Sequence, residues 1–211
     1  MKFVHIADMH FDSPFTSLGR IEGLSDIRRL EQRKIFKKII EYIQENNIEC
    51  LFISGDLYEN NYVKQSTIEY INNLFKTIPN TKIFIAPGNH DNLAADPKRG
   101  LEEIKGYYAC PKETDTKFYE DLKQLNNFYE FANRNRCYNK GRVVDVRKLQ
   151  FGNFTIKANL INSAPFSLLC NGNEDKGLHY LPQREIEKLD FDRQENYTIS
   201  IIHHGPEWYS D

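Results

Sequence analysis

The stretch "TKIFIAPGNHDN" (residues 81–92) places an apolar run directly before a cluster of polar residues. The apolar half predicts a buried β-strand, which Pro87 and Gly88 bring to an end. The polar half, Asn-His-Asp at 89–91, combines a neutral oxygen donor, an imidazole that titrates near neutral pH and a fixed negative charge. What chemistry this strand end can support depends on what the other strands carry at their own ends.

Two similar apolar runs come earlier in the chain, over 2–8 and 48–54. Apolar residues recurring at i, i+3, i+4 and i+7 predict a helix between these runs, over 26–46, and a second helix over 63–78. The order is therefore strand, helix, strand, helix, strand, with strands that are apolar throughout. This order is typical of a parallel sheet flanked by helices, and we expect an α/β fold.

The pattern is weaker over 94–140, where we expect an inserted or cap region within a single domain of residues 1–211. Helical spacing returns over 118–133. Two antiparallel strands are then predicted on either side of a turn at Gly152–Asn153. The segment "NYTISIIHHGPEW" (196–208) predicts one more strand, which ends in a pair of histidines.

The composition is that of an ordinary globular protein. Of the 211 residues, 40% are hydrophobic and 27% are charged, and the formal net charge is −2. This balance argues against a disordered chain. It also gives no overall basic excess, so binding to nucleic acid has to be argued from a local patch.

The cysteines and the N-terminus indicate a cytoplasmic location. The four cysteines are far apart in the sequence and form no C-x-x-C motif: Cys50, Cys110, Cys137 and Cys170. We expect reduced thiols rather than disulfides. The N-terminal apolar run is too short and too polar for a signal peptide, and no run is long enough to span a membrane.

Four apolar strands end in short clusters of polar residues. These clusters are "ADMH" (7–10), "SGDLYE" (54–59), "PGNHD" (87–91) and "IIHHGP" (201–206). Ligands bind at the carboxyl ends of the strands in an open α/β sheet, so we expect the four clusters to converge. In an extended chain, Asp8 and His10 would point to the same side. Oxygen and imidazole donors without a thiolate suit Mn, Fe or Zn.

The residue types predict a site for two metal ions. A carboxylate such as Asp56 can bridge two cations, and Asn89 and His203 would then supply an oxygen and an imidazole to the second ion. His90 would face the substrate, with Asp91 holding the orientation of its ring. Two neighbouring ions can clamp a phosphoryl group and activate a water molecule for in-line attack.

Each of these motifs also has a structural explanation when taken alone. Asp-x-His after a strand can be a cap, Gly-Asp a turn and Asn-His-Asp a loop. We expect His5 and His179 to be packed, structural histidines. The order of the clusters, each at the end of an apolar strand, is what favours a metal site over these explanations.

In this order, D-x-H, G-D, G-N-H-D and H-H before a proline resemble the calcineurin-like metallophosphoesterase superfamily. The resemblance covers nearly the whole chain and is densest over 2–92. There, "FVHIADMHFDSPF" and "IFIAPGNHDN" are similar to the SbcD-type DNA-repair exonuclease branch. The resemblance implies a four-layer α/β/β/α sandwich of two mixed β-sheets flanked by helices.

Carried over residue by residue, the resemblance assigns a role to each strand end. Asp8 and His10 would bind the first metal, Asp56 would bridge, and Asn89 and His203 would bind the second metal. The two ions would be divalent, with Mn²⁺ favoured and Fe, Zn or Ni as alternatives.

The resemblance also assigns the catalytic roles. His90 would protonate the leaving oxygen or stabilise the transition state, supported by Asp91. In the histidine pair we favour His203 as the metal ligand, with His204 as the alternative.

The family's Gly-His-x-His motif has no counterpart in this sequence. Each metal would therefore lack one imidazole. We expect the chain to be truncated at its C-terminus, as the N-terminal part of a longer protein, with a degenerate or split enzyme as the alternative.

Our leading hypothesis is a phosphodiesterase or nuclease that acts on DNA. Besides the family branch, it rests on a basic stretch over 133–148 that includes Arg134, Arg136, Lys140 and Arg142. Such a patch could bind a phosphate backbone. The same stretch would also suit a solvated loop. The resemblance further implies an ABC-type ATPase or an additional C-terminal domain as partner.

Two alternatives stay open. The same metal pair would serve a phosphomonoesterase or a protein phosphatase. With an incomplete metal site, the chain could instead be a non-catalytic binding module or fragment of a larger assembly.

Overall fold

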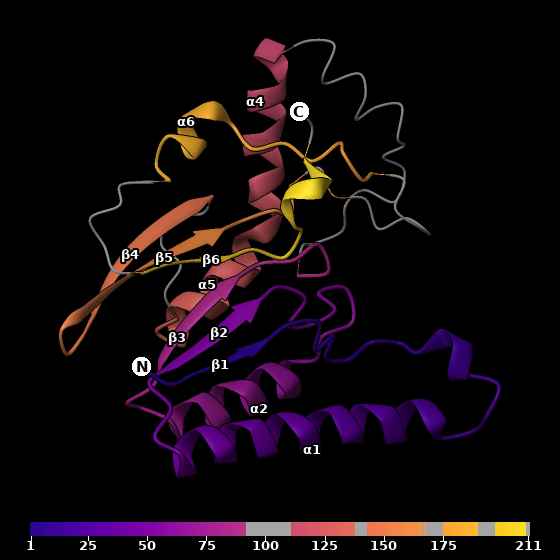
Figure 1. Cartoon of the computed structure of the whole chain (residues 1–211). Helices are drawn as coiled ribbons and strands as arrows, with labels where there is room; N and C mark the ends of the chain where they lie inside the picture. Colours follow the sequence, from indigo (N-terminus) through magenta and orange to yellow (C-terminus); the bar gives the residue numbers. More distant parts are fainter. Residues whose placement is uncertain (92–110, 138–142, 166, 168–174, 190–196, 210–211) are drawn as a thin grey trace.

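The chain forms two three-stranded β-sheets with helices packed against them (Figure 1). This computed structural model describes residues 1–91, 111–137, 143–165, 167, 175–189 and 197–209.

The first sheet consists of β1 (Phe3–Ile6), β2 (Cys50–Ser54) and β3 (Lys82–Ala86), in that order. All its strand pairs are parallel. Helices α1 (Leu24–Glu45) and α2 (Gln65–Lys76) connect the strands and lie on one side of the sheet (Figure 1). The predicted parallel sheet with crossover helices is confirmed.

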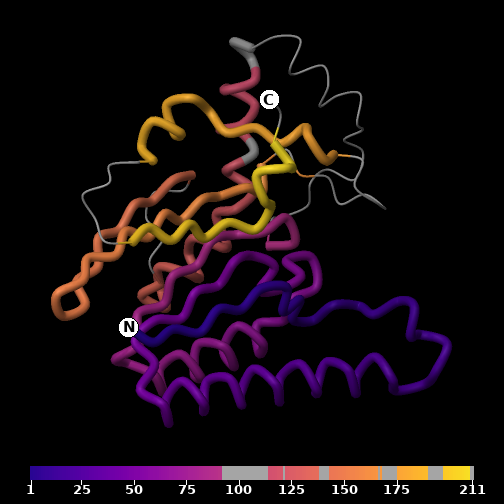
Figure 2. Tube along the Cα trace, in the orientation of Figure 1, coloured from indigo at the N-terminus to yellow at the C-terminus, as the bar shows by residue number. Residues whose placement is uncertain are grey.

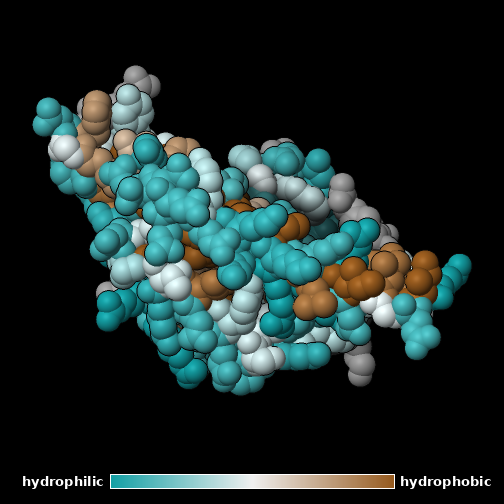
Figure 3. Space-filling view, turned by 90° about the horizontal axis from the view of Figure 1, so that it is seen from below, coloured by the Kyte–Doolittle hydropathy of each residue, from teal (hydrophilic) through white to brown (hydrophobic). Residues whose placement is uncertain are grey.

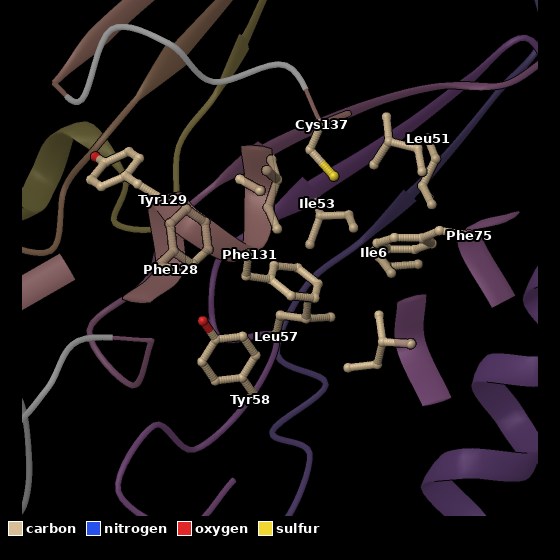
Figure 4. Close-up of a cluster of buried hydrophobic side chains, with 14 of the residues drawn as sticks. Ile6, Leu51, Ile53, Leu57, Tyr58, Phe75, Phe128, Tyr129, Phe131 and Cys137 are labelled. Carbon is tan, nitrogen blue, oxygen red and sulfur yellow. The ribbon is translucent and has the colours of Figure 1, made fainter. Parts of the chain in front are cut away.

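Alternation along the strands divides the apolar side chains between two cores. On β2, Leu51 and Ile53 point toward the helices and join a cluster that includes Phe75 of α2 (Figure 4). Phe52, between them, points the other way and belongs to a second cluster. Both faces of β2 are therefore buried, which explains why this strand is apolar throughout.

The second sheet is mixed. Strands β4 (Val144–Phe151) and β5 (Phe154–Ile161) form the predicted antiparallel hairpin around Gly152, which has a φ of 56°. Strand β6 (Tyr197–Ile201) pairs with β5 in parallel. The expectation of mixed sheets therefore holds for this sheet, whereas the described part of the first sheet is purely parallel.

The two sheets face each other. Phe52 and Phe84 of the first sheet pack with Ala158, Leu160 and Ile201 of the second. In the trace of Figure 2, β4–β6 run above the strands of the first sheet. This packing brings the end of β6 to the ends of β2 and β3, although the segments are more than a hundred residues apart in the sequence.

The predicted helical stretch over 118–133 is divided into three elements. These are α4 (Pro111–Asp121), the 3₁₀ helix η2 (Leu122–Leu125) and α5 (Asn126–Arg134). Side chains of α5 join the buried cluster to which α2 contributes, and there Phe131 packs on Tyr58 and Phe75 (Figure 4). An outer helical layer on the second sheet, and the expected insertion over 94–140, stay predictions, because residues 92–110 and 138–142 lie outside the described residues.

Short helical turns occupy three connections: η1 (Thr16–Leu18), α6 (Gln183–Ile186) and η3 (Pro206–Trp208). Seen from the α1 side, the surface is largely hydrophilic, with apolar side chains gathered at one end (Figure 3). The exposed apolar side chains include Ile21, just before α1, and Ile27 and Leu30 in its N-terminal half. Among the described helices, none combines the length and apolar character needed to cross a membrane.

Two of the four cysteines lie in described segments, and both agree with the expectation of reduced thiols. Cys50 of β2 and Cys137 after α5 are free and buried. Burial raises the pKa of Cys50 to about 11 and the pKa of Cys137 to about 12. Cys110 and Cys170 lie outside the described residues.

Candidate metal centre

The loops that follow β1 and β2 run side by side and bring the first two polar clusters together. The amide of Asp8 donates to the carbonyl of Gly55 over 3.2 Å, and the amide of His10 donates to the carbonyl of Asp56 over 2.9 Å. These bonds continue the parallel pairing of the strands beyond their ends. The D-x-H and G-D motifs thus form one edge of a common site.

Three of the expected ligands have an unusual backbone conformation. Asp8, His10 and Asp56 have φ values of 55°, 45° and 51°. This left-handed region costs a non-glycine residue about 1–2 kcal/mol. The expected extended alternation of Asp8 and His10 is therefore wrong, yet the two side chains meet, with His10 Nε2 at 3.9 Å from Asp8 Oδ1. Strain of this kind is characteristic of functional sites.

Asp56 lies at the centre of the cluster. Its Oδ2 atom is 3.5 Å from His10 Nε2 and 3.3 Å from His203 Nε2, and its Oδ1 accepts a hydrogen bond from the His90 amide over 2.9 Å. The side chain is almost fully buried. Burial alone would raise the pKa of Asp56, but the hydrogen bond and charge of His203 outweigh it and lower the pKa. Asp56 is thus held as a carboxylate.

Two groups of side chains that share Asp56 could each hold a metal ion. One group is His10, Asp56 and His90, and the other is Asp8, Asp56 and His203, each with its ligand atoms within 4.8 Å of one another. The sharing agrees with the expected bridging role of Asp56. The residues are grouped differently from the expectation, which placed Asp8 and His10 at the same metal. In the structure His10 is grouped with His90, because His90 approaches it from the loop after β3.

His203 enters the site from the end of β6. Its Nδ1 lies 3.0 Å from the carbonyl oxygen of Ser54, a contact in which the ring donates its proton. The other ring nitrogen, Nε2, faces Asp56 and lies 3.2 Å from Asn89 Oδ1. Burial lowers the pKa of His203, but the carboxylate of Asp56 more than compensates and raises it to about 8. A backbone acceptor that orients an imidazole in this way is a common support for a metal ligand.

The glycine before Asp56 is required by the approach of His203. Gly55 has a φ of 82°, and a Cβ atom there would lie 2.6 Å from Cγ of the His203 ring. Only glycine combines this conformation with this contact.

His204 points away from the cluster. Its Nδ1 is 3.0 Å from Ser163 Oγ, and its ring packs on His179 and Trp208. Burial and the neighbouring histidines lower its pKa to about 3, so it is neutral. The structure therefore places His203, and not His204, against Asp56.

Glu59 connects the two histidines of the first group. Its Oε1 is 2.9 Å from His10 Nδ1, and its Oε2 is 2.8 Å from His90 Nδ1. Burial favours a higher pKa for Glu59, but the two histidines lower it to about 2. The bond to Glu59 is also the main reason that the pKa of His90 is raised. Sequence reasoning missed this residue, although it closes the "SGDLYE" cluster three positions after Asp56.

Asp91 does not hold the ring of His90, so this part of the prediction is wrong. Its side chain is fully buried and accepts hydrogen bonds from the backbone amides of Gly88 and Tyr58, over 2.9 and 3.2 Å. Burial raises its pKa to about 7. Because the chain turns sharply after β3, Asp91 lies beneath the backbone and ties the loop after β3 to the loop after β2.

The two remaining histidines have partners outside the cluster. His179 is fully buried, and its Nε2 lies 3.2 Å from Asp175 Oδ2, as expected for a structural histidine. His5 was expected to be packed, but β1 is an edge strand and the side chain is exposed, with Nε2 at 2.8 Å from Ser54 Oγ.

The basic residues selected from the sequence are not brought to this cluster. Arg134 is in the last turn of α5 and Arg136 follows it, and both line a cavity with Lys82, the first residue of β3. That is the opposite end of the strand from Asn89. Lys140 and Arg142 lie outside the described residues.

The residues present fit divalent metal ions. Carboxylate and imidazole donors converge without a thiolate, and one buried carboxylate oxygen faces histidines of both groups. Such donors suit Mn, Fe or Zn.

The protein thus has an α/β fold of two facing sheets. At the ends of their strands, aspartates and histidines form a candidate centre for two metal ions. The model of the calcineurin-like phosphoesterase family matches residues 1–211, and the chain belongs to this family of hydrolases.

A more distant similarity agrees with this assignment. The chain is 19% identical over 153 residues to a protein of Bacillus subtilis (strain 168) named "uncharacterized metallophosphoesterase YhaO". The match covers 70% of this chain and 37% of that protein, so the chain spans well under half of its relative's length.

Proposed function

We propose that the protein is a metal-dependent phosphodiesterase whose substrate is nucleic acid. The observation that carries the hydrolytic part is the pair of ligand groups that share Asp56. The cluster is also open at the surface, since the side chain of Asp8 is 60% exposed and that of His90 is 31% exposed. An open cluster is compatible with a large substrate such as a polynucleotide.

Asp8, His10, Asp56, Asn89 and His203 would hold the ions. When bound, two divalent ions would supply positive charge to a phosphoryl group and lower the pKa of a coordinated water molecule. The chain's own contribution is to hold the donors in place before the substrate arrives.

His90 would exchange a proton with the leaving group of the substrate. Glu59 binds its Nδ1, which orients the ring and leaves Nε2 for a leaving oxygen. An imidazole supported by a carboxylate is well suited to general acid catalysis. The structure also offers His90 as a third donor beside His10 and Asp56. A His90→Asn variant separates the roles, because loss of a donor weakens metal binding whereas loss of an acid lowers kcat alone.

The test is hydrolysis of bis-p-nitrophenyl phosphate and p-nitrophenyl phosphate by the 211-residue chain with Mn²⁺, followed by a linear DNA substrate. We expect a preference for the diester and DNA cleavage that falls steeply with added salt. Asp56→Asn should lose at least about 100-fold in kcat, since it removes a group common to both ligand sets.

The alternatives predict different outcomes. Preference for the monoester, with DNA left intact, would favour a phosphomonoesterase. If neither ester is cleaved with any divalent ion while DNA is still bound, the chain is a binding module.

A further inference from the structure

A cavity of about 590 Å³ lies at the end of the first sheet opposite to the metal centre. It is formed where α2 ends, β3 begins and α5 ends. Its apolar lining includes Phe75, Ile78 and Ile83, which are themselves buried. Phe75 belongs to the same buried cluster as Cys137, the residue that follows Arg136 (Figure 4).

The charged residues that line this cavity are all cationic. Four of its lining residues are cationic and none is acidic: Lys76, Lys82, Arg134 and Arg136. This contrasts with the whole chain, whose net charge is −2. The residues that line the cavity therefore carry a local excess of positive charge.

Ordinary structural roles account for only part of this charge. Lys76 and Arg134 lie in the last turns of α2 and α5, where cations interact favourably with the helix dipole. Arg134 also pairs with Glu130 over 3.2 Å, and the ammonium group of Lys82 makes a cation–π contact with the ring of Phe151. Within the described ranges, the side chain of Arg136 has neither a hydrogen bond nor an ion pair.

Arg136 also has a backbone conformation that favours glycine. Its φ is 56°, and it ends α5 in a Schellman motif, in which its amide donates to the carbonyl of Asn133 and the amide of Cys137 donates to that of Ala132. Glycine is the usual residue at this position because it lacks a Cβ atom. An arginine here costs stability relative to glycine, and no hydrogen bond or ion pair of its side chain within the described residues offsets that cost.

We propose that this cavity binds a phosphorylated small molecule of nucleotide size. The volume falls in the usual range of small-molecule sites, and the apolar lining suits a base or similar group. Arginine binds phosphate oxygens through two parallel hydrogen bonds. The exposed guanidinium of Arg136 would bind the phosphate of the ligand in this way. A concave cavity with cations on its wall favours a compact anion over a polymer.

This site is separate from the metal centre. Strand β3 rises about 13 Å from Lys82 to Ala86 at ~3.3 Å per residue, and Asn89 lies beyond its end. A ligand in the cavity would therefore not contact the metal ligands. The inference does not depend on the proposed phosphodiesterase activity.

The test uses ADP as the probe, titrated calorimetrically into the full chain in EDTA and in the Asp56→Asn background, so that neither metal binding nor hydrolysis contributes. We expect one ADP per chain, weakened at least 10-fold by Arg136→Gly. Glycine fits the backbone at this position, so Arg136→Gly should unfold at the same temperature or higher. Arg28→Gln removes the same charge from an exposed position on α1 and should leave ADP binding unchanged.

Three results would overturn the inference. These are binding of neither ADP nor a single-stranded oligonucleotide, ADP binding that persists in Arg136→Gly and in Lys82→Gln, or binding of the oligonucleotide but not of ADP. The last result would assign the cationic wall to nucleic acid. A parallel titration with pyrophosphate measures the contribution of the phosphates alone, and we expect weaker binding than for ADP that is equally sensitive to Arg136→Gly.

Discussion

At the scale of single residues, one carboxylate positions two imidazoles. Glu59 uses one oxygen for His10 and the other for His90, and the two rings meet edge to face with centroids 4.7 Å apart. Each ring nitrogen bound by Glu59 is a donor, so both oxygens of Glu59 must accept. A carboxylate satisfies this requirement and a carboxamide cannot.

We therefore expect Glu59→Gln to disturb one of the two histidines, because the amide nitrogen of glutamine cannot accept a hydrogen bond. Loss of such a supporting contact costs about 10- to 100-fold in activity or metal affinity. The measurement is kcat on the diester together with calorimetric Mn²⁺ affinity. Glu31→Gln, on the exposed face of α1, is the matched control. Wild-type values for both quantities in Glu59→Gln would contradict a positioning role.

At the scale of elements, the turns after β2 and β3 decide where the ligands lie. Gly88 follows β3, and a Cβ atom there would lie 2.2 Å from Asp56 Oδ1 and 2.6 Å from the Asp56 amide nitrogen. The loop after β3 can therefore pack against Asp56 only because residue 88 has no side chain.

Gly88→Ala should displace Asp56, since backbone atoms on one side and a buried carboxylate on the other leave the methyl group no space. We expect a loss of about 1–3 kcal/mol of stability, typical of overpacking, and loss of tight Mn²⁺ binding. Denaturant unfolding and metal titration measure the two effects. Gly205→Ala is the control, because the three atoms nearest to its Cβ atom would all belong to the flexible side chain of Glu207. Equal behaviour of the two variants would count against this account.

Two buried thiols, one on β2 and one after α5, lead to a chemical prediction. Cys50 and Cys137 are buried in different cores, and burial raises both pKa values, to about 11 and about 12. At pH 8 both groups should therefore be protonated and inert. In a Cys110→Ser/Cys170→Ser variant, we expect Ellman's reagent to detect no thiol in the folded protein and two thiols in guanidinium chloride. Rapid reaction of either thiol in the folded protein would mean that its core is not packed in this way.

At the scale of the whole molecule, the candidate metal centre depends on the packing of two sheets. His203 reaches the cluster from β6, whereas Asp56 and Asn89 follow strands of the first sheet. The side chains that join the sheets include Phe52 and Phe84, whose ring centroids are 5.3 Å apart.

Phe84→Ala should weaken both the fold and the site. Phe84 is fully buried between the sheets, and truncation of such a side chain costs about 3–5 kcal/mol. We also expect weaker Mn²⁺ binding, because His203 is held in place by this interface. Urea unfolding and metal titration are the measurements, with Phe154→Ala at an exposed position as control. A stable variant whose Mn²⁺ binding is unchanged would show that His203 is positioned independently of the interface.

The sequence by itself determined the parallel first sheet, its two crossover helices and the identity of the strand-end clusters. These follow from local periodicity and from one topological rule: parallel strands end at the same edge. Asp8, Asp56 and Asn89 could be selected as candidate ligands for the same reason.

Only the tertiary structure decided which groups touch. It placed Glu59 rather than Asp91 against His90, because a sharp turn buries Asp91 beneath two backbone amides. It also placed Arg136 at the far end of β3, since the direction of α5 depends on its packing against Tyr58 and Phe75. Contacts of this kind depend on the backbone path in turns and on packing between distant segments, and neither leaves a periodic signal in the sequence.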